Sequence, residues 1–495
     1  MVFFIKKNLY IILVCSILLL GFFLRFYNYD ARWGLGYDQT HDAIVSRYAL
    51  ENFKIPLVGP FSSGAQFQTS GIWYIFISLS TLFFPYSIIT PWVVLTFCFV
   101  ILIFLMIKLA EKMEGKVFGL IVGMLTALSP SQIAQSLNLS LTAPMCFISF
   151  GAIYMMVKFV KTKKLIYLFF LSLFTSMGST THLSGAVLLI LLFITIIFTK
   201  SVSFKRLFII FIGLIIPGIP LIIFDLQNNF VNSTGLLNTI FYNQFNVSYE
   251  VLGRRWLTYL GVFWPNAWGY IIGGNKSLGY ALVLGSGAVF FWQIVRRKIT
   301  KEWLILVISF VLMVGAIRYV RTPIFDSYLI FLHPFVLLFS GYLIYFIFLK
   351  NKTIAILLFL VVVGFSAQKS IYEMMSATNN SIATVREMEN YLNKQFPNVK
   401  FSIYDYRFKH NGASFPLVLS LYTAGKISDN GKKIGIVIVN EKSVSDTAIF
   451  SKIFTSKGGY SFLDISGSSS AQLGEKWYYV NPSNIYNSTE NWYKK

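Results

Sequence analysis

Charged residues are scarce in this chain of 495 residues: they make up 13% of it, whereas hydrophobic residues make up 56%. About a quarter of the residues of a typical soluble domain are charged, so this composition excludes an ordinary soluble protein. Cysteine is scarce as well. The three cysteines all fall within apolar segments, which suits neither a disulfide framework nor a zinc cluster: Cys15, Cys98 and Cys146.

Acidic residues are half as frequent as basic ones, with 20 Asp and Glu against 42 Lys and Arg, and the formal net charge is +22. Such a charge could suggest a nucleic-acid partner, but its distribution indicates none. The basic residues gather in short groups between hydrophobic runs, at residues 6–7, 108–116, 158–164, 200–206, 296–301 and 350–352. This is the pattern of cytoplasmic loops in a membrane protein.

Placing every basic group in the cytoplasm predicts about eleven transmembrane helices. We expect them at residues 9–26, 87–107, 117–128, 142–157, 165–179, 183–199, 207–224, 280–295, 303–317, 328–349 and 353–367. This odd number of spans agrees with a cytoplasmic N-terminus and an outside C-terminus. The outer segment 225–279 contains Trp256, Trp264 and Trp268, which favour an interfacial helix because Trp prefers the headgroup layer.

The remainder of the chain is polar and has the patterning of a soluble domain. We expect a helix at 382–396, with Thr384 and Glu387 at capping-box spacing, and another at 415–424 that ends at Gly425. Residues 401–404, 434–439 and 478–480 read as strands. The predicted fold is thus a polytopic α-helical membrane domain, 1–368, whose first outer loop is 27–86, followed by a small extracytoplasmic α/β domain, 369–495.

The first outer loop holds the most prominent group of ionisable residues. Asp38 and Asp42 are four residues apart, so a helix would bring them to one face, with His41 adjacent. Ionisable groups beside hydrocarbon are costly and usually functional. We therefore interpret Asp38 as the centre of an active site at the outer membrane surface, although an isolated Asp in an outer loop is often just solvated.

The run from Tyr37 to Ala43, YDQTHDA, resembles the first outer-loop motif of the GT-C membrane glycosyltransferases, which include protein O-mannosyltransferases and aminoarabinose transferases of lipid A. In these an Asp, often followed by Glu, comes just after the first span. Residues 56–60 (PLVGP) with 71–74 (GIWY) resemble a P-L-x-G-P … G-P-x-Y-Y run of the family-39-like members. Residues 220–226 (PLIIFDL) and 179–182 (STTH) are similar to two further segments of the group.

The sequence departs from that pattern in two places. Gln39 stands where Glu is common. Several members also have a second acidic residue in the second outer loop, but here residues 129–141 contain no Asp or Glu, and Asn138 is the nearest polar candidate. A two-carboxylate metal site is therefore weakly supported, and whether a divalent metal takes part stays open.

The resemblance implies an inverting transfer of a sugar from a polyprenyl phosphate to an acceptor hydroxyl of a lipid, protein or glycan, with Asp38 as general base. The lipid phosphate then needs cationic stabilisation, for which Arg318 and Arg321 are the first candidates because guanidinium matches phosphate geometry. Arg254 and Arg255 are further candidates. Additional substrate-binding candidates are Asp42, His41, His182, Tyr328 and His333.

Each of these residues also has a structural interpretation. The arginines could snorkel toward headgroups, His333 could be a satisfied buried residue, Asp225 could cap a helix and Asp326 could pair with an arginine. A transporter or lipid flippase is the main alternative function, but it would need charged or broken helices at mid-membrane depth. A sensor or assembly protein whose outer domain is the functional part is a third.

Overall fold

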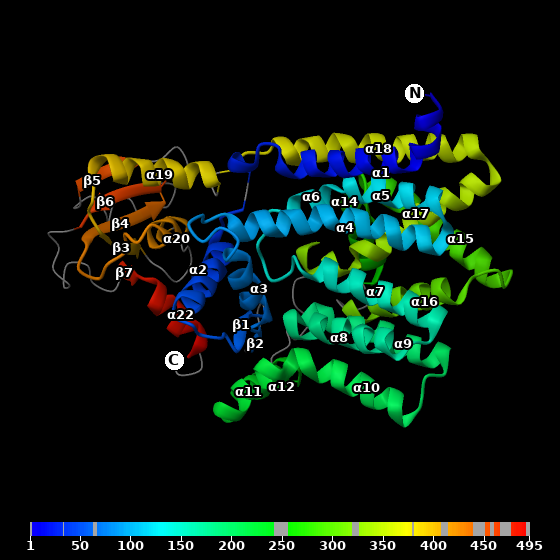
Figure 1. Ribbon diagram of the computed structural model, residues 1–495, viewed down its shortest axis with the longest axis horizontal. Coiled ribbons are helices and arrows are strands. Elements are labelled where there is room, and N and C mark those ends of the chain that lie inside the picture. The colour runs from blue at the N-terminus through cyan, green and yellow to red at the C-terminus, as the bar shows by residue number, and fades with distance from the viewer. Residues whose placement is uncertain are drawn as a thin grey trace.

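The computed structural model describes residues 2–32, 34–62, 67–241, 256–318, 326–378, 381–406, 414–438, 451–455, 460–465 and 477–491. A bundle of long helices occupies most of the molecule, and a small α/β domain lies at one end of it (Figure 1). The N-terminus lies at the opposite end. The turns that carry the basic groups lie at that end too, away from the α/β domain.

The bundle is built from apolar helices that follow the expected spans closely. They are α1 (Val2–Phe26), α4 (Thr90–Glu114), α5 (Lys116–Ala127), α7 (Met145–Thr162), α8 (Leu165–Thr181), η2 (Leu183–Leu188) with α9 (Leu189–Thr199), α10 (Phe204–Ile215), α11 (Ile219–Gln227), α15 (Lys276–Val295), α16 (Lys301–Ile317), η5 (Asp326–Leu332) with α17 (His333–Lys350), and α18 (Lys352–Met375).

In the described part of the chain, seven helices are long and apolar enough to cross a membrane. They correspond to the expected spans that begin near residues 9, 87, 142, 207, 280, 328 and 353. The other four expected spans form shorter apolar helices: α5 with 12 residues, α8 with 17, α9 with 11 and α16 with 17. The span at Phe204–Gln227 contains the short 3-10 turn η3 (Ile216–Gly218), where Pro217 interrupts the regular hydrogen bonding between α10 and α11.

The first outer segment forms a compact unit between the bundle and the α/β domain. It contains η1 (Tyr29–Ala31), α2 (Tyr37–Glu51), the strands β1 (Val58–Phe61) and β2 (Gln68–Ser70), and α3 (Ile72–Thr81). A Cβ atom on Gly71 would lie 1.9 Å from the carbonyl oxygen of Pro56, and one on Gly59 would lie 2.6 Å from that of Ser70. The two glycines of the PLVGP and GIWY runs thus allow this hairpin to close.

The outer segment after α11 is helical where it is described. It forms α12 (Val231–Phe241), a π-helical turn (Tyr259–Phe263) and α14 (Trp264–Ile271). The eight-residue α14 is too short to span a membrane. However, Trp264 and Trp268 are buried within the protein, and the indole of Trp268 donates to the Ser340 hydroxyl at 2.9 Å, so they do not face the headgroup layer as expected.

The α/β domain is a five-stranded sheet in the order β5-β6-β4-β3-β7. The central strands β3 (Phe401–Tyr406) and β4 (Lys432–Ile438) are parallel, and β5 (Ser451–Thr455), β6 (Tyr460–Asp464) and β7 (Trp477–Val480) join antiparallel. The helices α19 (Ile382–Gln395), α20 (Phe415–Thr423) and α22 (Pro482–Glu490) complete it. The expected elements are all present, and β5, β6 and α22 are additional.

The predicted capping box at Thr384 is wrong. Ser381 is the N-cap of α19, and its hydroxyl accepts a hydrogen bond from the backbone N–H of Thr384, which is the third helical residue. The predicted helix stop at Gly425 is confirmed. The helix α20 ends at Thr423, and Gly425 has a φ of +68°, the left-handed conformation that glycine adopts readily.

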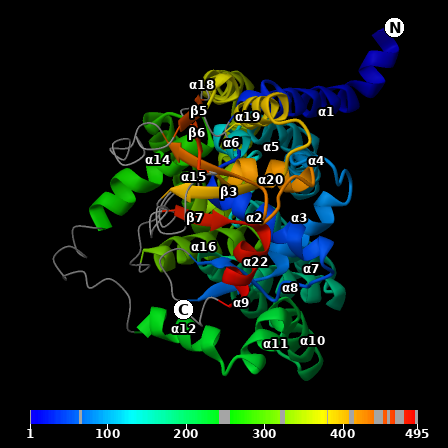
Figure 2. The ribbon, with the colours of Figure 1, turned by 90° about the vertical axis from the view of Figure 1, so that its left-hand side faces the viewer.

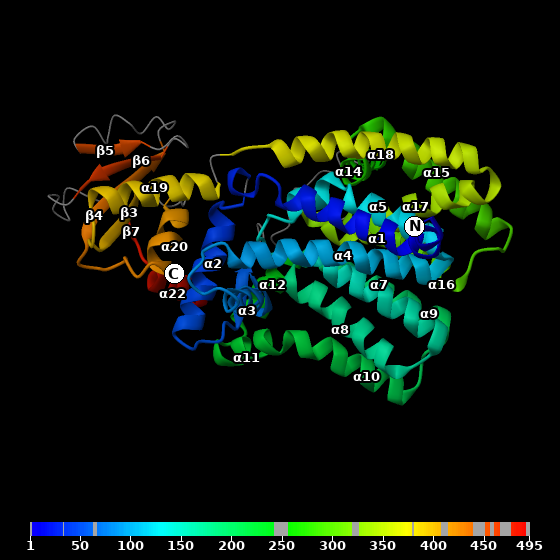
Figure 3. The ribbon, with the colours of Figure 1, turned by 45° about the horizontal axis from the view of Figure 1, so that its top comes forward.

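The membrane body and the α/β domain meet at α2. The helices α20 and α22 pack on α2, and α22 also contacts β1. Figure 2, which looks onto this end of the molecule, shows α2, α3 and α22 side by side. The helix α18 contacts α1, and Figure 3 shows α18 running toward the end of the bundle where α19 begins. The helix that carries the YDQTHDA run is therefore enclosed by both parts of the protein.

Candidate active site

Asp38 lies in the first turn of α2, at the end of the bundle that faces the α/β domain. Gly36 precedes this turn and provides no side-chain cap. A carboxylate is favourable at such a helix N-terminus because the backbone N–H groups there carry partial positive charge. The Asp38 side chain is exposed, so its carboxylate is accessible to a bound molecule.

Asp42, one turn further along α2, is buried, with 2% of its surface exposed. Its Oδ2 accepts a hydrogen bond from the indole N–H of Trp73 at 2.8 Å, and its Oδ1 lies 3.2 Å from Nδ1 of His41. Burial raises the pKa of Asp42, its contacts with His41 and Trp73 oppose that shift, and the charge of Asp38 adds to it. The two carboxylates of the motif thus have opposite environments.

The α/β domain covers the same face of α2. The ring of Phe415, the first residue of α20, stacks on Tyr37 at 4.9 Å and on His41 at 6.0 Å between centroids. The hydroxyl of Thr489, in α22, lies 3.4 Å from Nε2 of His41. Sequence reasoning missed Phe415 and Thr489, because no local pattern connects residues so distant in the chain. Trp73, by contrast, belongs to the GIWY run that the sequence analysis identified.

A chain of hydrogen bonds extends from Thr489 into the first outer segment and beyond. The carbonyl of Thr489 accepts from the side-chain amide of Gln68 at 3.0 Å. The backbone N–H and carbonyl of Gln68 bond to the side chain of Asn232, at 2.7 and 3.1 Å. Asp225 in turn caps α12, accepting from the backbone N–H groups of Asn232 and Ser233. The structural interpretation of Asp225 is confirmed.

Gln39 is connected to the second outer segment, residues 129–141. Its Nε2 donates to Oδ1 of Asn138 at 2.7 Å, and Nδ2 of Asn138 donates to Oε1 of Gln135 at 2.8 Å. Both Gln39 and Asn138 are buried. The two positions at which the sequence departs from the acidic pattern are therefore in direct contact.

His182 and Tyr328 lie together at the same end of the bundle. Their ring centroids are 4.8 Å apart, and Ser184 bridges them: its hydroxyl lies 2.8 Å from Nδ1 of His182 and donates to the carbonyl of Tyr328 at 3.0 Å. His182 also accepts from the backbone N–H of Ser184 and so begins η2.

Arg318 ends α16 and is buried, with 2% of its surface exposed. Its guanidinium lies 4.9 Å from the ring centroid of Trp256. His333, the first residue of α17, is also buried, and its Nε2 lies 3.4 Å from the hydroxyl of Ser131. Arg321, Arg254 and Arg255 lie outside the described residues, as does the side chain of Asp326.

The donor set near Asp38 does not fit a divalent metal ion. Both oxygens of Asp42 are engaged, Gln39 and Asn138 bond to each other, and His41 is held by Asp42 and Thr489. No group of three or more His, Cys, Asp or Glu side chains that could hold a metal occurs among the described residues.

The bundle of apolar helices with a small α/β domain at one end has the fold of two solved proteins, ArnT and an archaeal oligosaccharyltransferase, which is known as the GT-C fold. The chain has this GT-C fold. No protein-family profile and no curated protein sequence matches it.

Among solved structures, the chain is similar to ArnT from Cupriavidus metallidurans in the apo state, with a TM-score of 0.60 and 10% identity over 93% of this chain and 99% of that one. ArnT bound to undecaprenyl phosphate gives a TM-score of 0.58 at 10% identity, covering 92% and 98%. The Archaeoglobus fulgidus oligosaccharyltransferase complex with zinc and sulfate gives 0.54 at 12%, covering 97% of this chain and 76% of that one.

Proposed function

We propose that this protein is an integral membrane glycosyltransferase that moves a sugar, of hexosyl type, from a polyprenyl phosphate to an acceptor hydroxyl at the outer face of the plasma membrane. The observation that carries the proposal is the exposed carboxylate of Asp38 at the start of α2, within a GT-C fold. In that fold ArnT has been solved with undecaprenyl phosphate bound.

Asp38 acts as the general base in this proposal. The acceptor oxygen forms a bond to the anomeric carbon of the sugar as its proton passes to the carboxylate of Asp38. The bond from that carbon to the phosphate oxygen breaks, and its electron pair leaves on the polyprenyl phosphate. Asp42 cannot take this role because Trp73 and His41 occupy its oxygens. It acts instead by fixing His41 and the orientation of α2.

The leaving phosphate needs positive charge and hydrogen-bond donors. We assign these to Arg318 and Arg321, with His182, Tyr328 and His333 lining the approach. The guanidinium of Arg318 lies 4.9 Å from the ring centroid of Trp256, and its planar fork suits paired hydrogen bonds to phosphate oxygens. The pair formed by His182 and Tyr328 lies on neighbouring outer ends of the bundle, where a lipid headgroup would lie.

The proposed orientation follows from charge. The basic groups lie at the bundle end opposite α2, so that end faces the cytoplasm and α2 faces outside. The N-terminus is then cytoplasmic and the α/β domain extracytoplasmic. Residues 1–368 form the catalytic membrane domain in this proposal, and residues 369–495 form the domain that covers it.

Transport without transfer, as in a flippase, is the alternative. It is less well supported because the ionisable side chains of the site gather at one end of the bundle rather than at mid-depth. Purified protein in proteoliposomes that moves a lipid-linked sugar across the bilayer without transferring it would favour the flippase.

The decisive experiment compares Asp38→Asn with a matched variant, Glu51→Gln, at the far end of α2. Membranes containing each are incubated with a panel of radiolabelled polyprenyl-phosphate sugars. We expect Asp38→Asn to lower the rate of sugar transfer at least about a hundredfold, since general-base catalysis contributes that much to a rate. Glu51→Gln should retain transfer. Full activity in Asp38→Asn protein of normal folding would overturn the proposal.

A further inference from the structure

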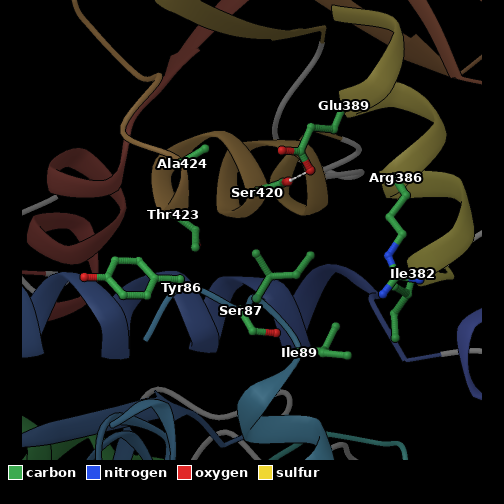
Figure 4. Close-up of a pocket in the computed structure, with 10 residues that line it drawn as sticks. Tyr86, Ser87, Ile89, Ile382, Arg386, Glu389, Ser420, Thr423 and Ala424 are labelled. Atoms are coloured by element: carbon green, nitrogen blue, oxygen red, sulfur yellow. Dashed lines mark hydrogen bonds between the residues drawn. The ribbon is translucent and has the colours of Figure 1, made fainter. Parts of the chain in front are cut away.

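A cavity of about 240 Å³ lies between the membrane body and the α/β domain, away from Asp38 and the network around Asp42. The turn between α3 and α4 forms its floor, with Tyr86 to Ile89, while α19 and α20 form its walls (Figure 4). It is smaller than the roughly 300–1,000 Å³ of typical drug-sized sites. It therefore suits a single headgroup better than a glycan chain or a peptide.

The walls carry one positive and one negative side chain. Arg386 of α19 lines the cavity and contacts Asp30 through Nη1. A guanidinium has five N–H donors, so others are available to a ligand. Glu389, one turn further along α19, accepts a hydrogen bond from the hydroxyl of Ser420 through Oε2 at 2.6 Å, which Figure 4 shows. Within the described residues, its Oε1 accepts no hydrogen bond.

The turn that forms the floor is strongly apolar beside the cavity. Leu82, Phe83 and Phe84 are exposed there, and Tyr86, which lines the cavity, is also 93% exposed. Exposed apolar and aromatic side chains at the outer end of a membrane bundle belong at the bilayer interface. The cavity therefore opens at the level where lipid headgroups lie.

We propose that this cavity binds the headgroup of an aminophospholipid, such as phosphatidylethanolamine. The phosphate pairs with Arg386, and the primary ammonium donates to Oε1 of Glu389, while the acyl chains lie against the exposed apolar turn. Because the floor belongs to the membrane body and the walls to the α/β domain, a bound lipid ties the two together. Phosphatidylcholine has a cation but no N–H donor, and phosphatidylglycerol has hydroxyl donors but no cation, so neither offers Glu389 a charged hydrogen-bond donor.

The test measures thermal unfolding of the full-length protein in detergent while dioctanoyl-phosphatidylethanolamine is titrated. We expect stabilisation that saturates, and no comparable effect of the dioctanoyl choline or glycerol lipids. Glycerophosphoethanolamine, which has no acyl chains, should act only at much higher concentration. Glu389→Gln should raise the half-saturating concentration about tenfold or more, since the ammonium then has only a neutral acceptor in place of a charged one.

Two further variants keep the test informative. Ser87→Phe fills the cavity without changing charge and should also abolish the effect. Glu387→Gln makes the same change as Glu389→Gln on the same helix but outside the cavity, and should respond like the unaltered protein. Equal stabilisation by all three lipids, or a response that persists in both Glu389→Gln and Ser87→Phe, would overturn the proposal. Sugar transfer plays no part in this readout, so the result is independent of the proposed enzymatic function.

Discussion

Gln39 and Asn138 are joined by a hydrogen bond of 2.7 Å between Nε2 and Oδ1, which connects the first outer helix to the second outer segment. The resemblance to GT-C enzymes leads one to expect Glu at the first position and an acidic residue somewhere in the second outer segment, where Asn138 is the nearest polar candidate. Two neutral amides can donate and accept at once, whereas two carboxylates so close would repel each other unless a cation lay between them. The amide pair thus supplies by itself a connection that a carboxylate pair could make only through an ion.

We therefore expect sugar transfer to persist in excess EDTA. The measurement is the transfer rate of purified protein before and after chelation, with and without added Mn²⁺, Mg²⁺ or Zn²⁺. As a control, the double variant Gln39→Glu/Asn138→Asp places two carboxylates in contact and should lose thermal stability, which a divalent ion should restore in part. Loss of transfer in EDTA that is reversed by one of these ions would contradict the prediction.

Trp73→Phe should impair the site through Asp42. The indole N–H is the donor to Oδ2 of a buried carboxylate, so its removal takes away one hydrogen bond of that carboxylate, at a cost of about 1–3 kcal/mol in the free energy of unfolding. Trp303→Phe is a matched control. Its indole donates to Oε1 of Glu114 at 2.7 Å, at the opposite end of the bundle. Both variants should unfold at lower temperature, but only Trp73→Phe should reduce transfer per folded molecule.

The docking of α22 should depend on pH through Glu490. Burial raises the pKa of Glu490 to about 7, against the opposing charge of Lys54. Lys54 also lies 4.9 Å from the ring centroid of Tyr486 in α22. A group whose pKa is higher in the docked state stabilises that state fully below its ordinary pKa, and this contribution is lost as the pH rises through about 7.

Hydrogen exchange of the α22 amides should therefore be slower at pH 5.5 than at pH 8, after correction for intrinsic exchange rates. Glu490→Gln should remove most of that difference, because the amide has no charge to bury. If the exchange rates at the two pH values differ as much in Glu490→Gln protein as in the unaltered protein, another group causes the pH dependence.

Arg318→Lys should weaken the use of the lipid-linked donor. An ammonium lacks the planar fork of a guanidinium and stacks less well on Trp256, so the KM for the donor should rise about tenfold or more. The same exchange at Arg206, in the first turn of α10, should leave kinetics unchanged. If both variants keep the original KM, Arg318 serves packing alone.

Much of the membrane body could be predicted because long apolar runs and basic turns are local signals. The ends of helices were less predictable. The last span was expected to stop at residue 367, but α18 continues to Met375, where Lys369 and Glu373 form an ion pair of 3.0 Å one turn apart. Ion pairs between polar side chains one turn apart can stabilise a helix beyond its apolar run. A prediction from hydrophobicity alone therefore ends such a helix too early.

The partners of the candidate site could be predicted far less well. The motif identified Asp38, Asp42 and His41, but Trp73, Phe415 and Thr489 reach them only through tertiary folding. The cap of α19 shows the same difficulty on a small scale. Ser381 and Thr384 are both suitable residues, and the direction of the preceding chain decides which of them becomes the cap.

Thr489 lies 448 residues after His41, yet the two are in contact. The helices of the bundle are synthesised before α22, so α2 lacks this part of its cover until α22 has been made. The final surroundings of α2 form only when α22 folds back onto it. Under the proposed function, a copy of the chain that ends before α22 should therefore be inserted in the membrane and yet transfer no sugar.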